Sequence, residues 1–203
     1  MNEHWTRGCQ ALAALDPVLA ALIGRFPAPI PRHPSSVFET LARAITGQQI
    51  STKAADTIWS RLQATHALTP EAMLQIDPAI LHCCGYSQRK TGYLIDLARH
   101  CASGTLDEAR WQEAEDEAII AQLTQVRGIG RWSAEMFLMF HLQRPDVFPL
   151  ADLGLQRALM RHYPDLQQAP RRALEHQGER WRPWRSLATW YLWRSLDPVE
   201  VAY

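Results

Sequence analysis

The amino-acid sequence predicts an all-α protein with about ten helices. Apolar residues recur at three- and four-residue spacing along most of the chain, as they do on a helix with one buried face. No window combines alternating apolar residues with a high content of β-branched residues, which is the pattern of a half-buried strand. Several helix starts are also marked by an Asp, Ser or Thr where an N-cap is expected.

Capping residues place the first helices. Asp16 is followed by a proline, and this pair predicts a helix start. Four prolines then fall between residues 27 and 34, and they predict an extended linker. Ser35 or Ser36 caps the next helix, because Glu39 stands where a capping box places its glutamate.

Two short breaks separate helices in the middle of the chain. The segment 47–51 (GQQIS) joins two predicted helices, and the segment 85–92 (GYSQRKTG) leads into a helix over 93–102. Arg89 and Lys90, in the second break, either bind a phosphate or lie in solvent. Solvent exposure is at least as common an outcome for such residues.

The run 123–134 (LTQVRGIGRWSA) is typical of a helix end, a tight turn and a second helix start. Gly128 and Gly130 bracket Ile129, and glycine both adopts left-handed backbone angles and leaves amides uncovered. The second helix, predicted over 132–142, therefore begins with outward-facing N–H groups, which is how helices bind phosphate. A hairpin that only turns the chain is the plain alternative, but the apolar residues on both flanks favour phosphate binding.

The composition limits the class of protein. The chain has 203 residues, 47% of them hydrophobic, which is enough for one compact domain or two small lobes. No apolar run reaches the roughly 18 residues that a membrane span needs, so we expect no membrane association. The four cysteines show neither C-x-x-C nor ferredoxin spacing, which predicts no iron–sulfur cluster. Reduced cysteines fit a cytoplasmic protein, associated with the nucleoid if the source is bacterial.

The formal net charge is zero, which counts against binding to nucleic acid by bulk electrostatics. The charge is nevertheless unevenly placed. The segment 171–194 carries six arginines against two glutamates, whereas the segment 107–117 carries six acidic residues against one arginine. A neutral total is therefore compatible with a basic face.

Two segments resemble a known family. The run 126–135 (VRGIGRWSAE) resembles the helix-hairpin-helix of the base-excision DNA glycosylases, and the run 147–154 (VFPLADLG) resembles the loop that carries their catalytic aspartate. The similarity extends from about Ser36 to Trp193. Within that superfamily (HhH-GPD) the chain is most similar to the DNA-3-methyladenine glycosylase II type, which removes alkylated bases.

The resemblance implies a fold of two helical lobes with a DNA-binding cleft between them. Residues 30–115 would form the central lobe. Residues 1–29 together with 116–203 would form the lobe that carries the hairpin and the catalytic aspartate. The whole chain would then be a single glycosylase unit.

The resemblance also assigns roles within the hairpin. The backbone amides of Gly128, Gly130 and Ser133 match positions that hold phosphate oxygens. Three backbone carbonyls match positions that often hold a structural Na⁺ or K⁺, which adds positive charge beside the phosphate; they belong to Thr124, Val126 and Ile129. No other cofactor is required.

Further positions correspond to contacts with an extruded base. Gln49 matches the residue that fills the gap left in the duplex. Trp193 matches the position that faces the extruded base, and Trp132 lines the same pocket. Indole faces attract a cationic base by about 0.5–2 kcal/mol. Met136 stands where the best-known relative has an aromatic residue, so the base preference can differ.

Asp152 invites two interpretations that are compatible. An aspartate directly before a helix predicted over 153–162 is an N-cap, and the resemblance makes the same residue the catalytic carboxylate. A capping aspartate lies at the positive end of a helix and stays ionised. An ionised carboxylate is what an oxocarbenium-like sugar requires as its glycosidic bond breaks.

The sequence therefore predicts a monofunctional DNA glycosylase of base-excision repair that acts as a monomer on double-stranded DNA containing damaged bases. Trp132 occupies the position of the lysine in lyase relatives, so we expect hydrolysis that leaves an abasic site uncut. One alternative is a glycosylase for oxidised or deaminated lesions. Another is a non-catalytic helix-hairpin-helix DNA-binding module, which has no need of a carboxylate at Asp152.

Overall fold

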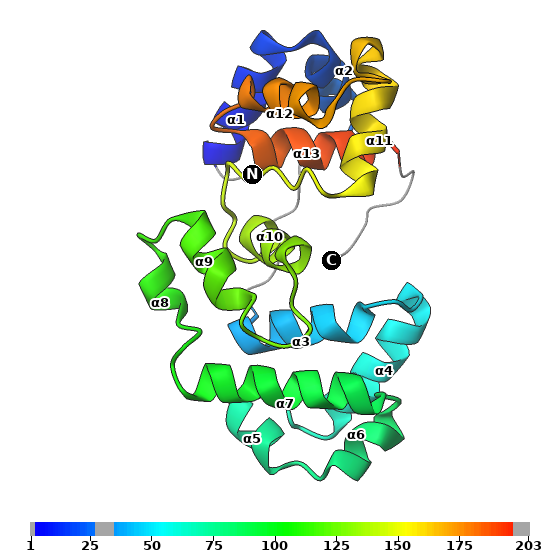
Figure 1. Cartoon of the computed structure of the whole chain (residues 1–203), viewed down its shortest axis with the longest axis vertical. Helices are drawn as coiled ribbons and strands as arrows, with labels where there is room; N and C mark the ends of the chain where they lie inside the picture. The colour runs from blue at the N-terminus through cyan, green and yellow to red at the C-terminus, as the bar shows by residue number, and fades with distance from the viewer. Residues whose placement is uncertain (1–2, 27–34, 197–203) are drawn as a thin grey trace. The chain divides into compact units, whose positions relative to one another are not determined.

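The computed structural model describes residues 3–26 and 35–196, and within these ranges the protein is entirely helical (Figure 1). The described residues form thirteen α-helices and one short 3₁₀-helix, with no strand among them. The predicted all-α class is confirmed. The linker predicted between residues 27 and 34 lies outside the described residues. No helix in the described part of the chain is long and apolar enough to cross a membrane.

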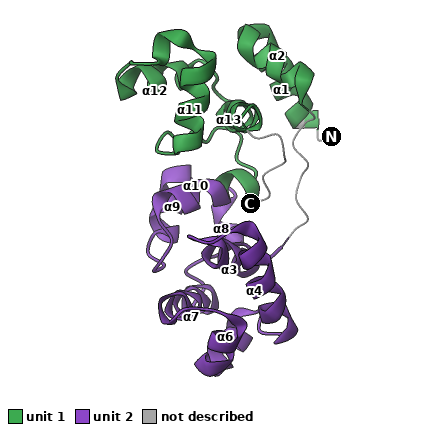
Figure 2. Cartoon of the chain, turned by 90° about the vertical axis from the view of Figure 1, so that its right-hand side faces the viewer, with its two compact units in different colours: residues 1–32, 138–203 green, residues 33–137 purple. Residues whose placement is uncertain are grey.

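The chain divides into two compact units, coloured separately in Figure 2. The first unit comprises residues 1–32 and 138–203, and the second comprises residues 33–137. The helices of the first unit are α1 (Glu3–Leu15), α2 (Pro17–Arg25), α11 (Leu153–His162), η1 (Pro164–Leu166), α12 (Arg171–Glu179) and α13 (Arg185–Arg194). Those of the second are α3 (Val37–Gly47), α4 (Thr52–Ala64), α5 (Pro70–Gln75), α6 (Pro78–Cys84), α7 (Gln88–Ala102), α8 (Glu108–Trp111) and α9 (Asp116–Leu123). Helix α10 (Arg131–Phe140) begins in the second unit and ends in the first.

The cap predicted at Ser36 forms, and a second serine caps the next helix. The Ser36 hydroxyl accepts the N–H of Glu39, while the Glu39 carboxylate accepts the N–H of Ser36, which completes the capping box of α3. Ser51 caps α4 through the N–H of Ala54. Side-chain caps of this kind satisfy backbone donors that a helix start otherwise leaves without a partner.

In the first unit, α13 packs against α1, α2 and α11. Asp16, the cap of α2, is only 2% exposed, and it accepts hydrogen bonds from three side chains besides the backbone of its own helix. These donors are the Tyr163 hydroxyl at 3.0 Å, the Trp181 indole at 3.0 Å and the Gln177 amide at 3.4 Å. A buried carboxylate is tolerated because its charge is met by donors on every side.

In the second unit, α7 is the longest helix, and it packs against α3 and α5 (Figure 1). The Thr46 hydroxyl at the end of α3 lies 2.7 Å from the Tyr86 hydroxyl, just before α7. Burial raises the pKa of Tyr86 to about 12, so this hydroxyl stays protonated. The end of α3 is thereby joined to the start of α7.

The division into units differs from the expected lobes in one segment. The sequence placed residues 116–203 together with residues 1–29, but residues 116–137 belong to the unit formed by 33–137. The physical reason is that the turn between α9 and α10 is bonded to the loop after α3 and to α7. The hairpin and Asp152 therefore belong to different units.

Candidate active site and nucleic-acid interface

The hairpin forms the tight turn that its glycines predicted. Helix α9 ends at Leu123, and the N–H of Ile129 donates to the Val126 carbonyl at 3.1 Å. Helix α10 makes its first backbone bond from the N–H of Ala134 to the Gly130 carbonyl, at 3.0 Å. The amides from Gly130 to Ser133 therefore precede the hydrogen-bond ladder of the helix, which is the arrangement that binds anions at helix starts.

The two glycines of the hairpin are required for different reasons. Gly128 has a φ of +88°, and a Cβ there would lie 2.3 Å from the Tyr93 ring. Gly128 therefore serves the fold, because any side chain would be strained and would clash. A Cβ at Gly130 would meet nothing within 4 Å. The open space at Gly130 leaves its backbone accessible to a close ligand.

Both arginines beside the hairpin glycines are paired with carboxylates. Arg127 donates its backbone N–H to Asp96 at 2.9 Å, and its guanidinium lies 3.2 Å from the same carboxylate. Arg131 pairs with Glu117 and with Glu135. The hydrogen bond from Arg131 lowers the pKa of Glu117, so this pair is ionised at neutral pH. The hairpin thus offers an anion mainly its backbone amides.

The segment 47–51 forms a loop beside the hairpin in the second unit. Gln49 is exposed and has a left-handed φ of +60°, which is uncommon for a residue other than glycine. Its side-chain oxygen accepts a hydrogen bond of 3.1 Å from Arg89. Gln48 donates its side-chain amide to the Gly128 carbonyl at 2.8 Å. The loop that carries Gln49 is therefore joined directly to the hairpin.

Lys90 does not simply lie in solvent, which was one of the two alternatives predicted for it. Its ammonium donates to the carbonyls of Thr46 and Gln48 at 2.7 and 2.8 Å, so it holds the protein's own backbone. Burial, followed by the nearby charge of Arg89, lowers the pKa of Lys90. Sequence reasoning missed this role because a lysine at a helix start gives no sign of which carbonyls it will reach.

In the first unit, Asp152 caps α11 as predicted. Its Oδ1 accepts the N–H of Leu155 at 2.6 Å and the indole N–H of Trp193 at 2.8 Å. The side chain is half-buried, and the next residue, Leu153, is 64% exposed. A Cβ at Gly154 would lie 3.0 Å from Asp152 Oδ1 and 3.4 Å from Trp193 Nε1. Gly154 thus leaves space for the carboxylate–indole pair.

The residues predicted for the base pocket differ in exposure. Trp193 is only 8% exposed, and its ring stacks on Phe140 with centroids 6.2 Å apart. Trp132 is 40% exposed, at the start of α10, while Met136 is buried one turn further on. Trp193 therefore presents its N–H edge to Asp152, whereas Trp132 presents ring surface to solvent.

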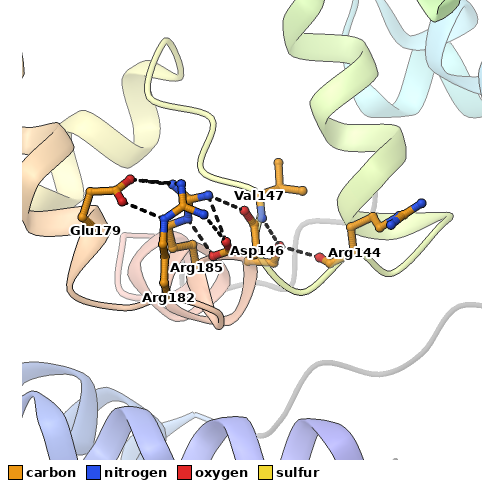
Figure 3. Close-up of polar contacts among 7 residues, drawn as sticks. Arg144, Asp146, Val147, Glu179, Arg182 and Arg185 are labelled. Carbon is orange, nitrogen blue, oxygen red and sulfur yellow. Dashed lines mark hydrogen bonds and ion pairs between the residues drawn. The ribbon is translucent and has the colours of Figure 1, made fainter. Parts of the chain in front are cut away.

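The segment that leads to Asp152 is fixed by a polar cluster that the sequence did not indicate (Figure 3). Asp146 accepts hydrogen bonds from Arg182 at 2.6 Å and from Arg185 at 2.7 Å. The Ser186 hydroxyl donates to the Arg144 carbonyl at 2.6 Å and accepts the N–H of Val147 at 2.9 Å. These bonds attach the segment to the start of α13, the helix that ends just after Trp193.

The same cluster changes the interpretation of the arginine-rich segment 171–194. Arg182 and Arg185 pair with Asp146 and with Glu179, as the dashed lines in Figure 3 show. Arg171 pairs with Glu175 four residues later on α12. At least three of the six arginines are therefore neutralised within the first unit. The excess of positive charge in the sequence does not amount to a basic face of the same size.

The described residues contain no group of three or more His, Cys, Asp or Glu side chains that could hold a metal ion. All four cysteines are free thiols.

Comparison with known proteins identifies the family. Residues 42–183 match the sequence profile described as HhH-GPD superfamily base excision DNA repair protein. The matched range contains both the hairpin and Asp152. The chain belongs to the HhH-GPD superfamily.

Individual relatives in this superfamily support the assignment. DNA-3-methyladenine glycosylase 1 of Schizosaccharomyces pombe is 33% identical over 204 residues, which is 96% of this chain and 83% of that protein. A relative from Bacillus subtilis is 35% identical over 173 residues, and the chain spans only 60% of its length.

Solved structures in the superfamily share the fold. The crystal structure of DNA-3-methyladenine glycosidase from Bacillus halodurans matches with a TM-score of 0.84 and 33% identity, over 93% of this chain and 88% of that one. The S. pombe 3-methyladenine DNA glycosylase in complex with abasic DNA matches with a TM-score of 0.75 and 30% identity, over 93% and 96%.

Proposed function

We propose that this protein is a monofunctional DNA glycosylase that extrudes alkylated bases of the 3-methyladenine type from duplex DNA and releases them by hydrolysis. The observation that carries the proposal is the setting of Asp152. Two N–H donors hold one oxygen of a half-buried carboxylate, in a segment that the superfamily match includes. A DNA-binding module without activity has no use for a negative charge beside phosphates.

In this proposal Asp152 acts on the sugar. The bond between C1′ and the base nitrogen breaks, and its electron pair leaves with the base. The deoxyribose ring becomes electron-poor, and the carboxylate stabilises that charge. A water oxygen then bonds to C1′, and its proton passes to Asp152 or to solvent. Because an N-alkylated purine is already cationic, it leaves as a neutral base and needs no strong general acid.

The hairpin would hold the DNA backbone while this happens. The amides of Gly128, Gly130 and Ser133 bind phosphate oxygens, and the open space beside Gly130 allows the close approach. The carbonyls of Thr124, Val126 and Ile129 are neutral oxygen donors of the kind that suit Na⁺ or K⁺. A bound ion would place positive charge beside the phosphate without taking part in the chemistry.

Trp132, Trp193 and Met136 would contact the extruded base, and Gln49 would fill the gap that the base leaves. The exposed ring of Trp132 suits stacking on a cationic purine. Trp132 occupies the position where lyase relatives have a lysine. Without that amine no Schiff base forms there, so the abasic product stays uncut. We propose that the protein acts as a monomer in the cytoplasm.

The test is release of bases from a methylated duplex by the wild type and by Asp152→Asn. Asparagine still caps a helix, so the variant keeps the fold. We expect its single-turnover rate to fall at least ~100-fold, as when a charge-stabilising group is removed from an active site. Asp165→Asn, an exposed aspartate just beyond α11, is the matched control and keeps the wild-type rate.

Two results would contradict the proposal. Equal rates for the wild type and Asp152→Asn would remove the carboxylate from the chemistry, and no release by either would leave only DNA binding. Strand cleavage at the abasic site without added alkali or heat would contradict the monofunctional assignment.

A further inference from the structure

Three successive side chains along α7 hold the two parts of the second unit that would contact DNA. Lys90, Tyr93 and Asp96 are spaced three residues apart, so each side chain lies beside the next along the helix. Lys90 contacts the loop that carries Gln49, while Tyr93 and Asp96 contact the hairpin.

The hairpin end of this series is closely fitted. The Tyr93 ring occupies the space where a side chain at Gly128 would stand. Asp96 holds both the backbone N–H and the guanidinium of Arg127. Burial by itself would raise the pKa of Asp96, but the hydrogen bonds and charge of Arg127 lower it below the usual value. The turn is therefore fixed to α7 by shape and by charge.

The loop end depends on Lys90. A single ammonium bonds two carbonyls, Thr46 at the end of α3 and Gln48 in the loop, at 2.7 and 2.8 Å. An ammonium has three donors on a flexible stem, so it can join carbonyls from different segments. Gln48 in turn bonds the Gly128 carbonyl through its side-chain amide. Lys90, Gln48 and Gly128 thus form a continuous connection from α7 through the loop to the hairpin.

The conformation of Gln49 shows that the loop needs this support. Its left-handed φ of +60° is strained for a residue with a side chain, and such conformations persist only where the surroundings fix them. Lys90 holds the carbonyl of the preceding residue, and Arg89 holds the Gln49 side chain. The two adjacent basic residues at the start of α7 therefore control both the backbone and the side chain at this position.

We propose that Lys90 is a positioning residue that keeps the loop of Gln49 in fixed register with the phosphate-binding hairpin. This inference rests on the proposed glycosylase function. When the hairpin holds a phosphate, the connection through Lys90 and Gln48 brings Gln49 to one defined position along the strand. Without Lys90 the hairpin still binds DNA, but Gln49 no longer stands ready to replace the extruded base.

The test separates DNA binding from base extrusion in the full-length protein. Lys90→Met keeps the length of the side chain and removes all its donors. The matched control is Lys53→Met, because Lys53 is the only other lysine in the chain and lies exposed on α4. The measurements are the Kd for an undamaged duplex, the fluorescence of a 2-aminopurine beside the lesion, which rises on extrusion, and the single-turnover rate of base release.

For Lys90→Met we expect the Kd for undamaged duplex to stay within about twofold of wild type, because the hairpin amides are untouched. We expect the extrusion signal and the single-turnover rate to fall on the order of tenfold or more, as when a charged hydrogen-bond donor is lost. Lys53→Met should match the wild type in all three. Lys90→Arg keeps a charge and several donors, and it should recover part of the loss.

A second variant covers the case in which Lys90→Met does not fold. Gln48 is half-buried, and Gln48→Ala breaks only its link to the Gly128 carbonyl. It should lower extrusion while leaving the Kd for undamaged duplex unchanged.

Two outcomes would overturn the inference. Wild-type extrusion in both Lys90→Met and Gln48→Ala would show that the connection through Lys90 and Gln48 has no effect on base extrusion. A loss of undamaged-duplex binding equal to the loss of extrusion would instead make Lys90 a phosphate ligand or a folding residue. Absence of base release by the wild type would count against the proposed function alone, because the fluorescence signal still decides the role of Lys90.

Discussion

Two aspartates of the first unit make the same local structure in different surroundings. Asp16 and Asp152 each cap a helix through Oδ1, and each accepts the indole N–H of a tryptophan on a later segment of the chain. The partners are Trp181 and Trp193, at 3.0 and 2.8 Å.

The difference lies in what surrounds the carboxylate. Asp16 is 2% exposed, and its Oδ2 accepts from three side chains. Asp152 is half-buried, next to the exposed Leu153, and its Oδ1 accepts one backbone and one indole N–H. A carboxylate enclosed by donors can only hold the fold together, whereas one at the surface can also meet a substrate. An aspartate at a helix N-cap is therefore not by itself evidence of a functional site; its exposure decides.

The largest effect expected from this comparison is on stability. Asp16→Ala removes an N-cap and leaves buried donors without an acceptor, so we expect a loss of about 2–4 kcal/mol in the free energy of unfolding. Asp152→Ala removes a cap and the acceptor of a single indole N–H, so it should lose less, about 1–2 kcal/mol. Urea denaturation of both variants measures the contrast. Equal losses would show that the two sites are energetically alike.

The hairpin glycines offer a second contrast of this kind. Gly128→Ala forces a side chain into a positive φ and against Tyr93, so we expect a loss of about 1–3 kcal/mol. Gly130→Ala meets open space and should keep its stability, yet weaken binding to undamaged duplex, because the methyl group obstructs the phosphate. Thermal unfolding and a binding titration check the pair. Unchanged binding in Gly130→Ala would show that no phosphate binds beside Gly130.

Removing each indole N–H in turn extends the comparison of Asp16 with Asp152. Trp193→Phe removes the N–H that holds Asp152, so we expect the single-turnover rate to fall roughly tenfold, the effect of one hydrogen bond to a charged group. Trp181→Phe should instead lower stability by about 1–3 kcal/mol and leave the rate of the folded fraction unchanged. A rate loss in Trp181→Phe that exceeds its unfolded fraction would break the distinction between the two sites.

The smallest effect concerns Gly154. Alanine there would crowd Asp152 Oδ1 at 3.0 Å and displace the carboxylate slightly, so we expect a rate loss of a few-fold. Stability should not fall, because alanine is the better helix former by about 1 kcal/mol. Gly24→Ala in α2, where a Cβ meets nothing within 4 Å, is the control and should change no rate. A stability loss in Gly154→Ala without a rate loss would contradict this account of its role.

The caps and the hairpin could be predicted from the sequence because their signals are local. Ser36 with Glu39, and Asp152 before an amphipathic run, each define a helix start within four residues. Helix α11 has the bounds 153–162 that the cap together with the amphipathic run predicted. The hairpin likewise follows from two glycines that are separated by a single residue, together with their apolar flanks.

The remaining features depend on contacts between segments far apart in the sequence. The donors around Asp16 come from residues 163–181, and the carbonyls that bind Lys90 lie more than 40 residues before it. The grouping of residues 116–137 with the second unit depends in the same way on bonds to the loop after α3 and to α7. No local pattern encodes such pairings.

The most direct test of the central claim asks whether Asp152 stabilises positive charge at the sugar. The measurement compares the affinity of the protein for two abasic duplexes, one with a protonated pyrrolidine in place of the sugar and one with a neutral tetrahydrofuran of the same shape. We expect the wild type to prefer the charged analogue by more than about tenfold, because an enzyme binds mimics of its transition state most tightly. Asp152→Asn should bind both equally. An undiminished preference for the charged analogue in Asp152→Asn would contradict the account.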